Sequence, residues 1–224
     1  MQKIQFITLD GPDCVGKTTQ LGLLTKLILE RYPNRPIHQT KLLGGDGKND
    51  ALNKLRAELL DPNFDHSDPV KEQTLFSFAD SLGLDGARRF LEENPDGIVI
   101  KDRGNGSNLI FAMTLGLNMK QVEDIHYSVI LKERYIDQQF GTLNLILVPN
   151  KSDFIEKRLA ARGPGKLDWF ENQQRQLGVL QGFRQIKDFV SMQGIRIELV
   201  DFEERDTIVD IHDKIKKVLD KYHI

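Results

Sequence analysis

The stretch Gly11-Pro12-Asp13-Cys14-Val15-Gly16-Lys17-Thr18 has the residue types and spacing of a phosphate-binding loop, G-x-x-x-x-G-K-T. In such a loop the backbone N–H groups surround phosphate oxygens, the lysine adds charge at the β and γ phosphates, and the following hydroxyl can ligate Mg²⁺. The sequence therefore predicts a site for a nucleoside triphosphate such as ATP. Its predicted residues are Gly11, Asp13, Cys14, Val15, Gly16, Lys17, Thr18 and Thr19.

Asp13 is unusual inside a phosphate loop, because a carboxylate repels phosphate groups. We expect its side chain to point away from the triphosphate, toward a sugar hydroxyl or a metal ion on the acceptor side. The simpler interpretation is an aspartate that shapes the turn without binding a ligand.

A second pair of candidate residues follows the apolar run Ile98-Val99-Ile100-Lys101. Such a run predicts a buried strand, and its tip delivers Asp102 and Arg103 to the edge of the sheet where the phosphate loop lies. Asp102 could hold Mg²⁺ together with Thr18, and Arg103 could bind a phosphate group through two parallel hydrogen bonds. A solvated charge pair at a strand end is the alternative.

Two further arginines, Arg158 and Arg162, lie four residues apart on a predicted helix and so share one face. The glycine-proline stretch that begins at Gly163 follows them directly. Arginines beside such a loop indicate a lid that closes over a transferring phosphoryl group and offsets its developing charge. With Lys17 and Arg103, these two arginines are the predicted catalytic residues; a solvated basic face is the alternative.

The elements that must position these residues alternate between strand and helix, which predicts an α/β fold with a parallel sheet. The strands are expected near 3–9, 37–41, 97–101, 143–148 and 195–200. The helices are expected near 17–31, 49–60, 69–94, 104–116, 120–134, 151–162, 168–191 and 203–221. The sequence thus predicts one domain over residues 1–224, a three-layer α/β/α sandwich of the P-loop NTPase class, with a small lid near 162–170.

Composition restricts the partners. With 31 basic and 33 acidic residues the formal net charge is −2, so no overall basic field recruits nucleic acid. The single cysteine, Cys14, cannot form an internal disulfide. The sequence shows no secretory leader and no apolar run long enough to span a bilayer, so we expect a cytoplasmic protein without a membrane partner.

Several segments together resemble the thymidylate kinase family over nearly the whole chain. They are Asp10-Gly11-Pro12-Asp13 with Gly16-Lys17-Thr18-Thr19, Thr40-Lys41 with Gly44-Gly45, Leu55-Arg56, Asp102-Arg103 with Ser107-Asn108 and Phe111, and the stretch from Arg158 to Glu171. The resemblance implies ATP as donor, Mg²⁺, transfer to a deoxynucleoside monophosphate such as dTMP, and a homodimer. The acceptor-binding residues that it implies are Asp13, Lys41, Arg56, Phe78, Arg103, Ser107, Asn108 and Phe111. Cys14 stands where some members carry an arginine, and those lacking it have lid arginines instead, as here.

The chain departs from the family pattern on the acceptor side. Gly104 replaces a tyrosine, Ala112 a glutamine, and Ser81 an arginine that contacts the base. We expect the missing ring at Gly104 to leave open space beneath the acceptor sugar. Another or modified nucleotide, a nucleotide within nucleic acid, or loss of activity are therefore alternatives to dTMP.

One further motif favours a different class of protein. Asn150-Lys151-Ser152-Asp153 matches the guanine-binding motif Asn-Lys-x-Asp of GTP-dependent switches. The tip of the third strand, Asp102-Arg103-Gly104-Asn105, lacks the Asp-x-x-Gly of those proteins. A helix start capped by Asn150 or Ser152 explains the same residues.

Overall fold

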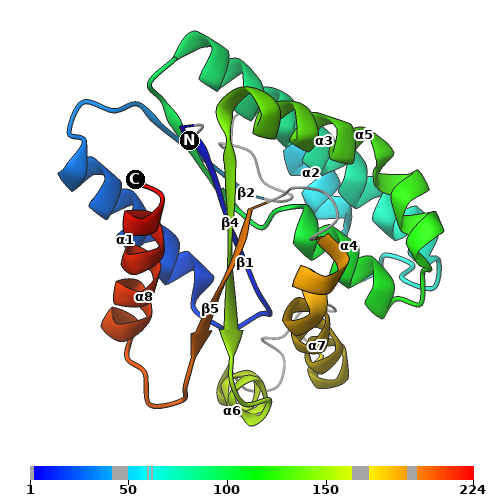
Figure 1. The fold of residues 1–224 in the computed structure, drawn as a ribbon. Helices are drawn as coiled ribbons and strands as arrows, with labels where there is room; N and C mark the ends of the chain where they lie inside the picture. The colour runs from blue at the N-terminus through cyan, green and yellow to red at the C-terminus, as the bar shows by residue number, and fades with distance from the viewer. Residues whose placement is uncertain (1–2, 42–49, 60, 62, 163–171, 191–195) are drawn as a thin grey trace.

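The computed structural model describes residues 3–41, 50–59, 61, 63–162, 172–190 and 196–224. Five parallel strands form one sheet, as predicted, and their order is β2-β3-β1-β4-β5 (Figure 1). They are β1 (Phe6–Asp10), β2 (Ile37–Lys41), β3 (Ile98–Asp102), β4 (Thr142–Pro149) and β5 (Ile197–Phe202). At least one helix lies between each strand and the next along the chain, which is the connection that parallel strands require.

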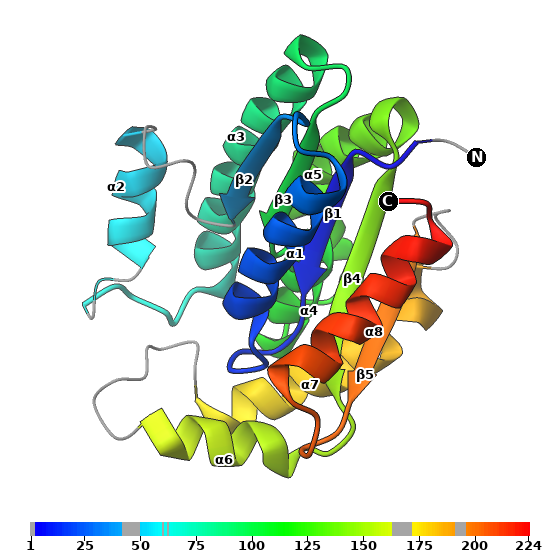
Figure 2. The same ribbon diagram turned by 90° about the vertical axis from the view of Figure 1, so that its left-hand side faces the viewer.

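Helices cover both faces of the sheet, which confirms the three-layer sandwich (Figures 1 and 2). One face carries α1 (Lys17–Arg31) and α8 (Ile208–Lys221). The other carries α3 (Pro69–Glu93), α4 (Asn105–Thr114), α5 (Met119–Phe140) and α7 (Gln173–Val190). The helix α2 (Asp50–Leu59) packs against α3, and α6 (Asp153–Arg162) lies beyond the end of β4.

The central strand is buried along its whole length, as both faces of a parallel sheet are covered. Its register with β3 pairs Leu9 with Asp102, so the carboxyl ends of the two strands meet at one edge of the sheet. At this edge the phosphate loop follows Asp10 and the turn with Arg103 follows Asp102. The topology therefore brings together two candidate segments that are about 90 residues apart in the sequence.

Three helix boundaries differ from the prediction. The helix α7 begins at Gln173 instead of 168, directly after Asn172, whose side chain accepts the Arg175 N–H at 2.8 Å. The helix α5 continues to Phe140 instead of ending near 134, and it stops where Gly141 adopts a φ of 70°. The helix α8 begins at Ile208 instead of 203, because Thr207 and Asp210 form a capping box that fixes the first turn. The lid predicted near 162–170 lies outside the described residues apart from residue 162.

None of the helices in the described ranges has the length and hydropathy needed to cross a membrane. The cytoplasmic location stays a prediction.

Candidate functional site

The phosphate loop has the backbone that its glycines predict. Gly11 has a φ of 136°, and a Cβ there would lie 2.5 Å from the Leu147 carbonyl oxygen on β4. Gly16 has a φ of 90° and caps the N-terminus of α1. Both positions exclude a side chain, by close approach at Gly11 and by a left-handed backbone at both. The loop therefore turns sharply between the end of β1 and the positive end of the α1 dipole.

Lys17 is buried within this loop. Its Nζ donates to the carbonyl oxygens of Gly11 at 3.1 Å and Pro12 at 2.5 Å, and lies 3.7 Å from Asp13 Oδ1. Burial and, to a smaller extent, the nearby charge of Arg103 lower the pKa of Lys17 to about 8, against the opposing charge of Asp13. A bound phosphate would supply the negative charge that this buried ammonium group needs.

Arg103 comes from the other side of the same edge and reaches the loop. Its Nη1 donates to the Gly11 carbonyl oxygen at 3.1 Å, and its Nη2 donates to Asp13 Oδ1. The guanidinium carbon lies 5.1 Å from the centre of the Phe111 ring. Arg103 has a φ of 69°, a left-handed backbone that is uncommon outside glycine and tends to occur at functional sites. The two predicted phosphate-binding cations thus converge on Asp13.

Asp10, which is not among the predicted site residues, holds the turn that carries Arg103. Its carboxylate accepts from the Gly104 N–H at 3.0 and 3.1 Å and from the Ser107 hydroxyl. Burial raises the pKa of Asp10, and the bonds from Ser107 and Gly104 oppose that rise. A carboxylate at the tip of an apolar strand, next to a phosphate loop, is the signal that could have identified it.

The open space expected at Gly104 is wrong. A Cβ at this residue would lie 3.0 Å from Asp10 Oδ2 and 3.1 Å from Thr8 side-chain atoms. Gly104 is buried against β1, and the close approach of its N–H to Asp10 requires a small residue. The absent ring therefore reflects packing at this turn and says nothing about room for an acceptor.

Two residues at the start of α7 also belong to the site, and sequence reasoning missed them. Gln176 donates from Nε2 to Asp13 Oδ2 at 2.6 Å and accepts the Asp13 N–H at 2.8 Å. Arg175 lies 3.3 Å from Glu72 on α3, with its guanidinium 5.9 Å from the centre of the Phe111 ring. One helical turn therefore connects the phosphate loop, α3 and α4.

Behind the predicted acceptor residues lies a buried polar network. Asn108 donates to Asp80 Oδ2 at 2.7 Å, and the Lys101 ammonium lies 2.5 Å from Asp80 Oδ1. Burial lowers the pKa of Lys101, but the attraction of Asp80 and Glu133 outweighs it and leaves the pKa above its usual value. The network fixes the buried face of α4, which carries Ser107 and Asn108.

The structure does not bring Phe78 into this group. Its ring is 55% exposed on the solvent side of α3, away from the buried side that carries Asp80. Phe76 is half-buried and packs toward α2 instead. Phe111, against Arg103, is the aromatic residue that the structure places beside the phosphate loop.

The remaining predicted residues border the site or lie outside it. Lys41 ends β2 and pairs in register with Asp102, whose Oδ1 is buried without a hydrogen-bond partner among the described residues. Thr18 and Thr19 are exposed at the start of α1, and Arg56 lies on α2.

Of the two predicted lid arginines, Arg158 is exposed on α6, with its guanidinium carbon 5.2 Å from the centre of the Phe154 ring. The side chain of Arg162 lies outside the described part of the chain.

The Asn-Lys-x-Asp motif forms the turn after β4. Asn150, Lys151 and Ser152 are exposed, and Asp153 begins α6, where it lies 3.2 Å from Lys157. This arrangement matches the helix start that explains the motif without guanine.

Comparisons with known proteins agree with the resemblance. No family model matches the chain. A thymidylate kinase of Exiguobacterium sibiricum is 40% identical over 73 residues, which spans 32% of this chain and 32% of that relative. The crystal structure of thymidylate kinase from Ehrlichia chaffeensis covers 97% of this chain and 99% of its own, with a TM-score of 0.69 and 20% identity. Candida albicans thymidylate kinase, described as having broad substrate specificity, covers 100% of this chain and 95% of its own, with the same TM-score and identity. The resemblance to thymidylate kinases is therefore confirmed, in fold over nearly the whole chain and in sequence over about a third of it.

Proposed function

We propose that the protein transfers the γ-phosphoryl group of ATP to the phosphate of a deoxynucleoside monophosphate, and that dTMP is its acceptor. One observation carries the proposal: Lys17 and Arg103, from different elements, both reach Asp13 in the phosphate loop. Two phosphate-binding cations this close together can hold donor and acceptor phosphates in contact, and positioning is most of what phosphoryl transfer needs. The relatives named thymidylate kinase support dTMP as the acceptor.

In this proposal each side of the site has a separate task. The loop N–H groups and Lys17 hold the ATP phosphates, while Arg103, with Lys41 and Arg56, holds the acceptor phosphate. Asp13 contacts the acceptor sugar, and Ser107, Asn108 and Phe111 line the side toward the base. The lid arginines, Arg158 and Arg162, close over the transferring group and offset its charge. An acceptor phosphate is already an anion at neutral pH, so no general base is needed.

The residues at the loop also fit Mg²⁺. Asp102 presents a buried carboxylate oxygen without a hydrogen-bond partner among the described residues, and the exposed hydroxyl of Thr18 starts α1. Oxygen ligands from one or two side chains, completed by water and phosphate oxygens, are what Mg²⁺ usually takes. Bound there, the ion would neutralise charge on the phosphates; Thr18 and Asp102 are the residues that would hold it.

A coupled ADP-release assay across the common nucleoside monophosphates tests the proposal. We expect dTMP to be turned over most efficiently, with ATP preferred over GTP. Lys17→Ala and Arg103→Met should each lower kcat/KM by at least about 100-fold, since both remove charge that stabilises the transition state. Lys26→Ala, a change at an exposed lysine of α1, is the control and should leave turnover unchanged.

The outcomes separate the alternatives. Turnover of a different monophosphate would move the proposal to that acceptor. GTP binding without any phosphorylated acceptor would favour a switch, and wild-type turnover by Lys17→Ala would refute the assignment of the loop.

We further propose that the protein forms a homodimer through the outer surface of α3 and α5. Tyr127, Leu131 and Tyr135 follow one another at four-residue spacing on α5 and are 63%, 45% and 43% exposed, and the exposed Phe78 lies on α3, which packs beside α5. Exposed apolar side chains in such a row favour a second copy as the covering partner. Light scattering should find a dimer that Leu131→Glu dissociates; Val209→Glu, on the opposite side of the sheet, should not.

A further inference from the structure

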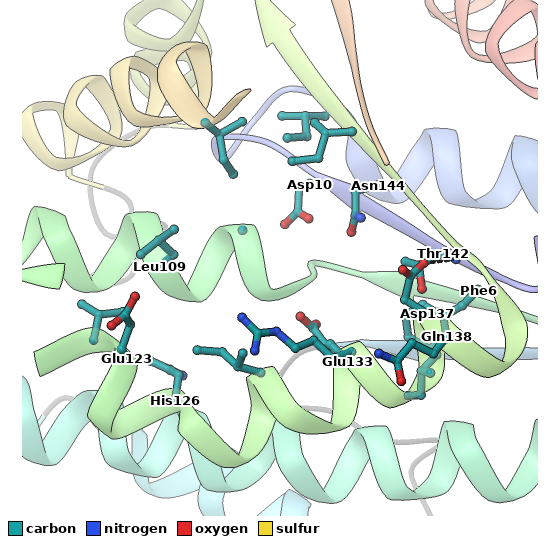
Figure 3. A pocket seen from close by; sticks show the side chains of 18 of the residues that line it. Phe6, Asp10, Leu109, Glu123, His126, Glu133, Asp137, Gln138, Thr142 and Asn144 are labelled. Atoms are coloured by element: carbon teal, nitrogen blue, oxygen red, sulfur yellow. Dashed lines mark hydrogen bonds between the residues drawn. The ribbon is translucent and has the colours of Figure 1, made fainter. Parts of the chain in front are cut away.

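A cavity of about 450 Å³ lies between the sheet and the helices α4, α5 and α7 (Figure 3). Phe6, Asn144 and Ile146 of β1 and β4 are part of its floor, and Leu109 and Ile186 lie on its walls. The volume falls within the range of small-molecule sites, roughly 300–1,000 Å³. Residues 11–18 do not line it, so the cavity is separate from the phosphate loop and shares Asp10 with the site above.

His126 on α5 contributes an unused hydrogen-bonding group to this cavity. The side chain lines the cavity and is 1% exposed, yet neither ring nitrogen has a hydrogen-bond partner among the described residues. Burial lowers the pKa of His126 to about 4 despite the opposing charge of Asp80, so the ring is neutral near pH 7. A neutral imidazole offers one donor and one acceptor, and leaving both unpaired in the interior is unfavourable.

The charges around the cavity disfavour an anionic occupant. Glu133 lies 4.0 Å from Lys101 and Asp137 lies 3.9 Å from Arg196, while Asp10 accepts the bonds described above. Among the described lining residues the cation is Arg134, which is exposed. Against this arginine the lining carries four carboxylates, those of Asp10, Glu123, Glu133 and Asp137, which would repel a phosphate or carboxylate placed in the cavity.

We propose that this cavity binds a small uncharged nitrogen heterocycle, of the class that includes nucleobases and nucleosides without a phosphate, and that His126 is its hydrogen-bonding anchor. Such a molecule carries an N–H donor and a carbonyl or ring-nitrogen acceptor on one edge, which complements a neutral imidazole. Its apolar faces pack against Phe6, Ile130 and Ile146.

The occupant would also influence the phosphate site. Asp10 and Gly106 line the cavity, and Asp10 holds the turn that carries Arg103. We therefore expect an occupant to change the KM for the acceptor; this part rests on the proposed function, whereas binding itself does not.

The binding test uses three probes with the full-length protein: benzimidazole, thymine and thymidine, measured by saturation-transfer NMR and calorimetry at pH 8. Benzimidazole tests the shared chemistry, and the other two distinguish a base from a nucleoside. At least one should bind at millimolar concentration or below, and saturating ATP with Mg²⁺ should not displace it. Benzoate, an anion of similar size, should not bind.

Matched variants locate the site. Ile130→Trp, which fills the cavity, should weaken binding at least tenfold, while Val209→Trp, at an exposed position of α8 on the other face of the sheet, should leave it unchanged. His126→Leu should weaken it about three- to tenfold, the equivalent of one net hydrogen bond. If Ile130→Trp does not fold, the effect of His126→Leu on probe binding still tests whether the probe binds in this cavity.

Binding that is absent for all three probes, competes with ATP, or is equally strong in both cavity variants would overturn the site. Binding to a protein that phosphorylates no acceptor would contradict the proposed function and leave the site standing. Turnover of dTMP by a protein that binds none of the probes would support the proposed function and overturn the cavity site. An acceptor KM that changes less than twofold at saturating probe would overturn the coupling through Asp10.

Discussion

Replacing Lys17 with methionine should remove a pH-dependent cost of folding. The Lys17 ammonium is 8% exposed, and burial, with Arg103 beside it, lowers its pKa to about 8 from the usual 10.5. Each pKa unit corresponds to about 1.4 kcal/mol, so holding this charge in the ligand-free loop costs the folded protein about 3 kcal/mol. This is a net cost, which remains although the ammonium group donates hydrogen bonds to the carbonyl oxygens of Gly11 and Pro12.

The sign of the pH dependence follows from the direction of the change in pKa. Below pH 8 both the folded and the unfolded chain carry the proton, and the folded protein bears the whole cost. Between about pH 8 and 10.5 the folded protein releases the proton first, so the unfolded chain binds more protons and stability rises with pH. The wild-type free energy of unfolding should therefore increase over this range by about 3 kcal/mol relative to a Lys17→Met variant.

Urea unfolding of both proteins at half-unit steps from pH 7 to 10 measures this difference. Subtracting one profile from the other removes the groups that titrate equally in both proteins. Lys26→Met, a change at a 75% exposed lysine on the same helix, is the control and should show no such rise. A difference between wild type and Lys17→Met that stays constant from pH 7 to 10 would refute the reasoning. Saturating ATP should abolish the rise, since bound phosphate restores the charged form.

Three further changes test the surrounding structure. His126 has a pKa of about 4 in the folded protein, so lowering the pH from 6.5 to 4 should destabilise wild type by up to about 3 kcal/mol relative to His126→Leu, as chemical denaturation at each pH would show. Arg175→Met leaves Glu72 buried without its arginine and should cost about 3–5 kcal/mol in urea unfolding, much of it recovered when Glu72→Leu is added. Gly104→Ala places a methyl group 3.0 Å from Asp10 Oδ2, so thermal unfolding should show a loss of about 1–3 kcal/mol and the assay a raised acceptor KM.

The sheet and the phosphate loop could be predicted from the sequence because local signals determine both. Apolar strands alternate with helices, and the glycine spacing of the loop dictates a backbone that only a few sequences allow. The end of α5 was predicted too early because Tyr135 to Phe140 are mixed in polarity, and Gly141 ends the helix where no periodicity indicates it.

The contacts within the site were less accessible to sequence reasoning. Gln176 meets Asp13 across 163 positions of the chain, and no local pattern marks a glutamine at the start of a helix as a partner of a phosphate loop. Gly104 was misinterpreted for a different reason. From the sequence alone, a glycine in place of a large side chain indicates open space, whereas in the fold neighbouring atoms already occupy that space. The distances between such residues depend on how α4 and α7 pack, and this packing is set only when the helices and the sheet come together.

The contacts of Asp13 hold the two cations of the site in place. Arg103, Lys17 and Gln176 all direct donors or positive charge toward this one carboxylate, in a loop whose backbone is shaped for phosphate. Asp13 and the loop carbonyl oxygens supply the negative charge that the buried Lys17 and the partly buried Arg103 require. A phosphate brings more charge and more acceptor oxygens than the carboxylate, so it can replace Asp13 as the partner of Arg103 without a change of fold. Asp13 would then be released on the acceptor side, where its carboxylate can accept a hydrogen bond from a sugar hydroxyl. We therefore expect Asp13 to exchange its contact with Arg103 for one with the acceptor sugar when phosphate binds.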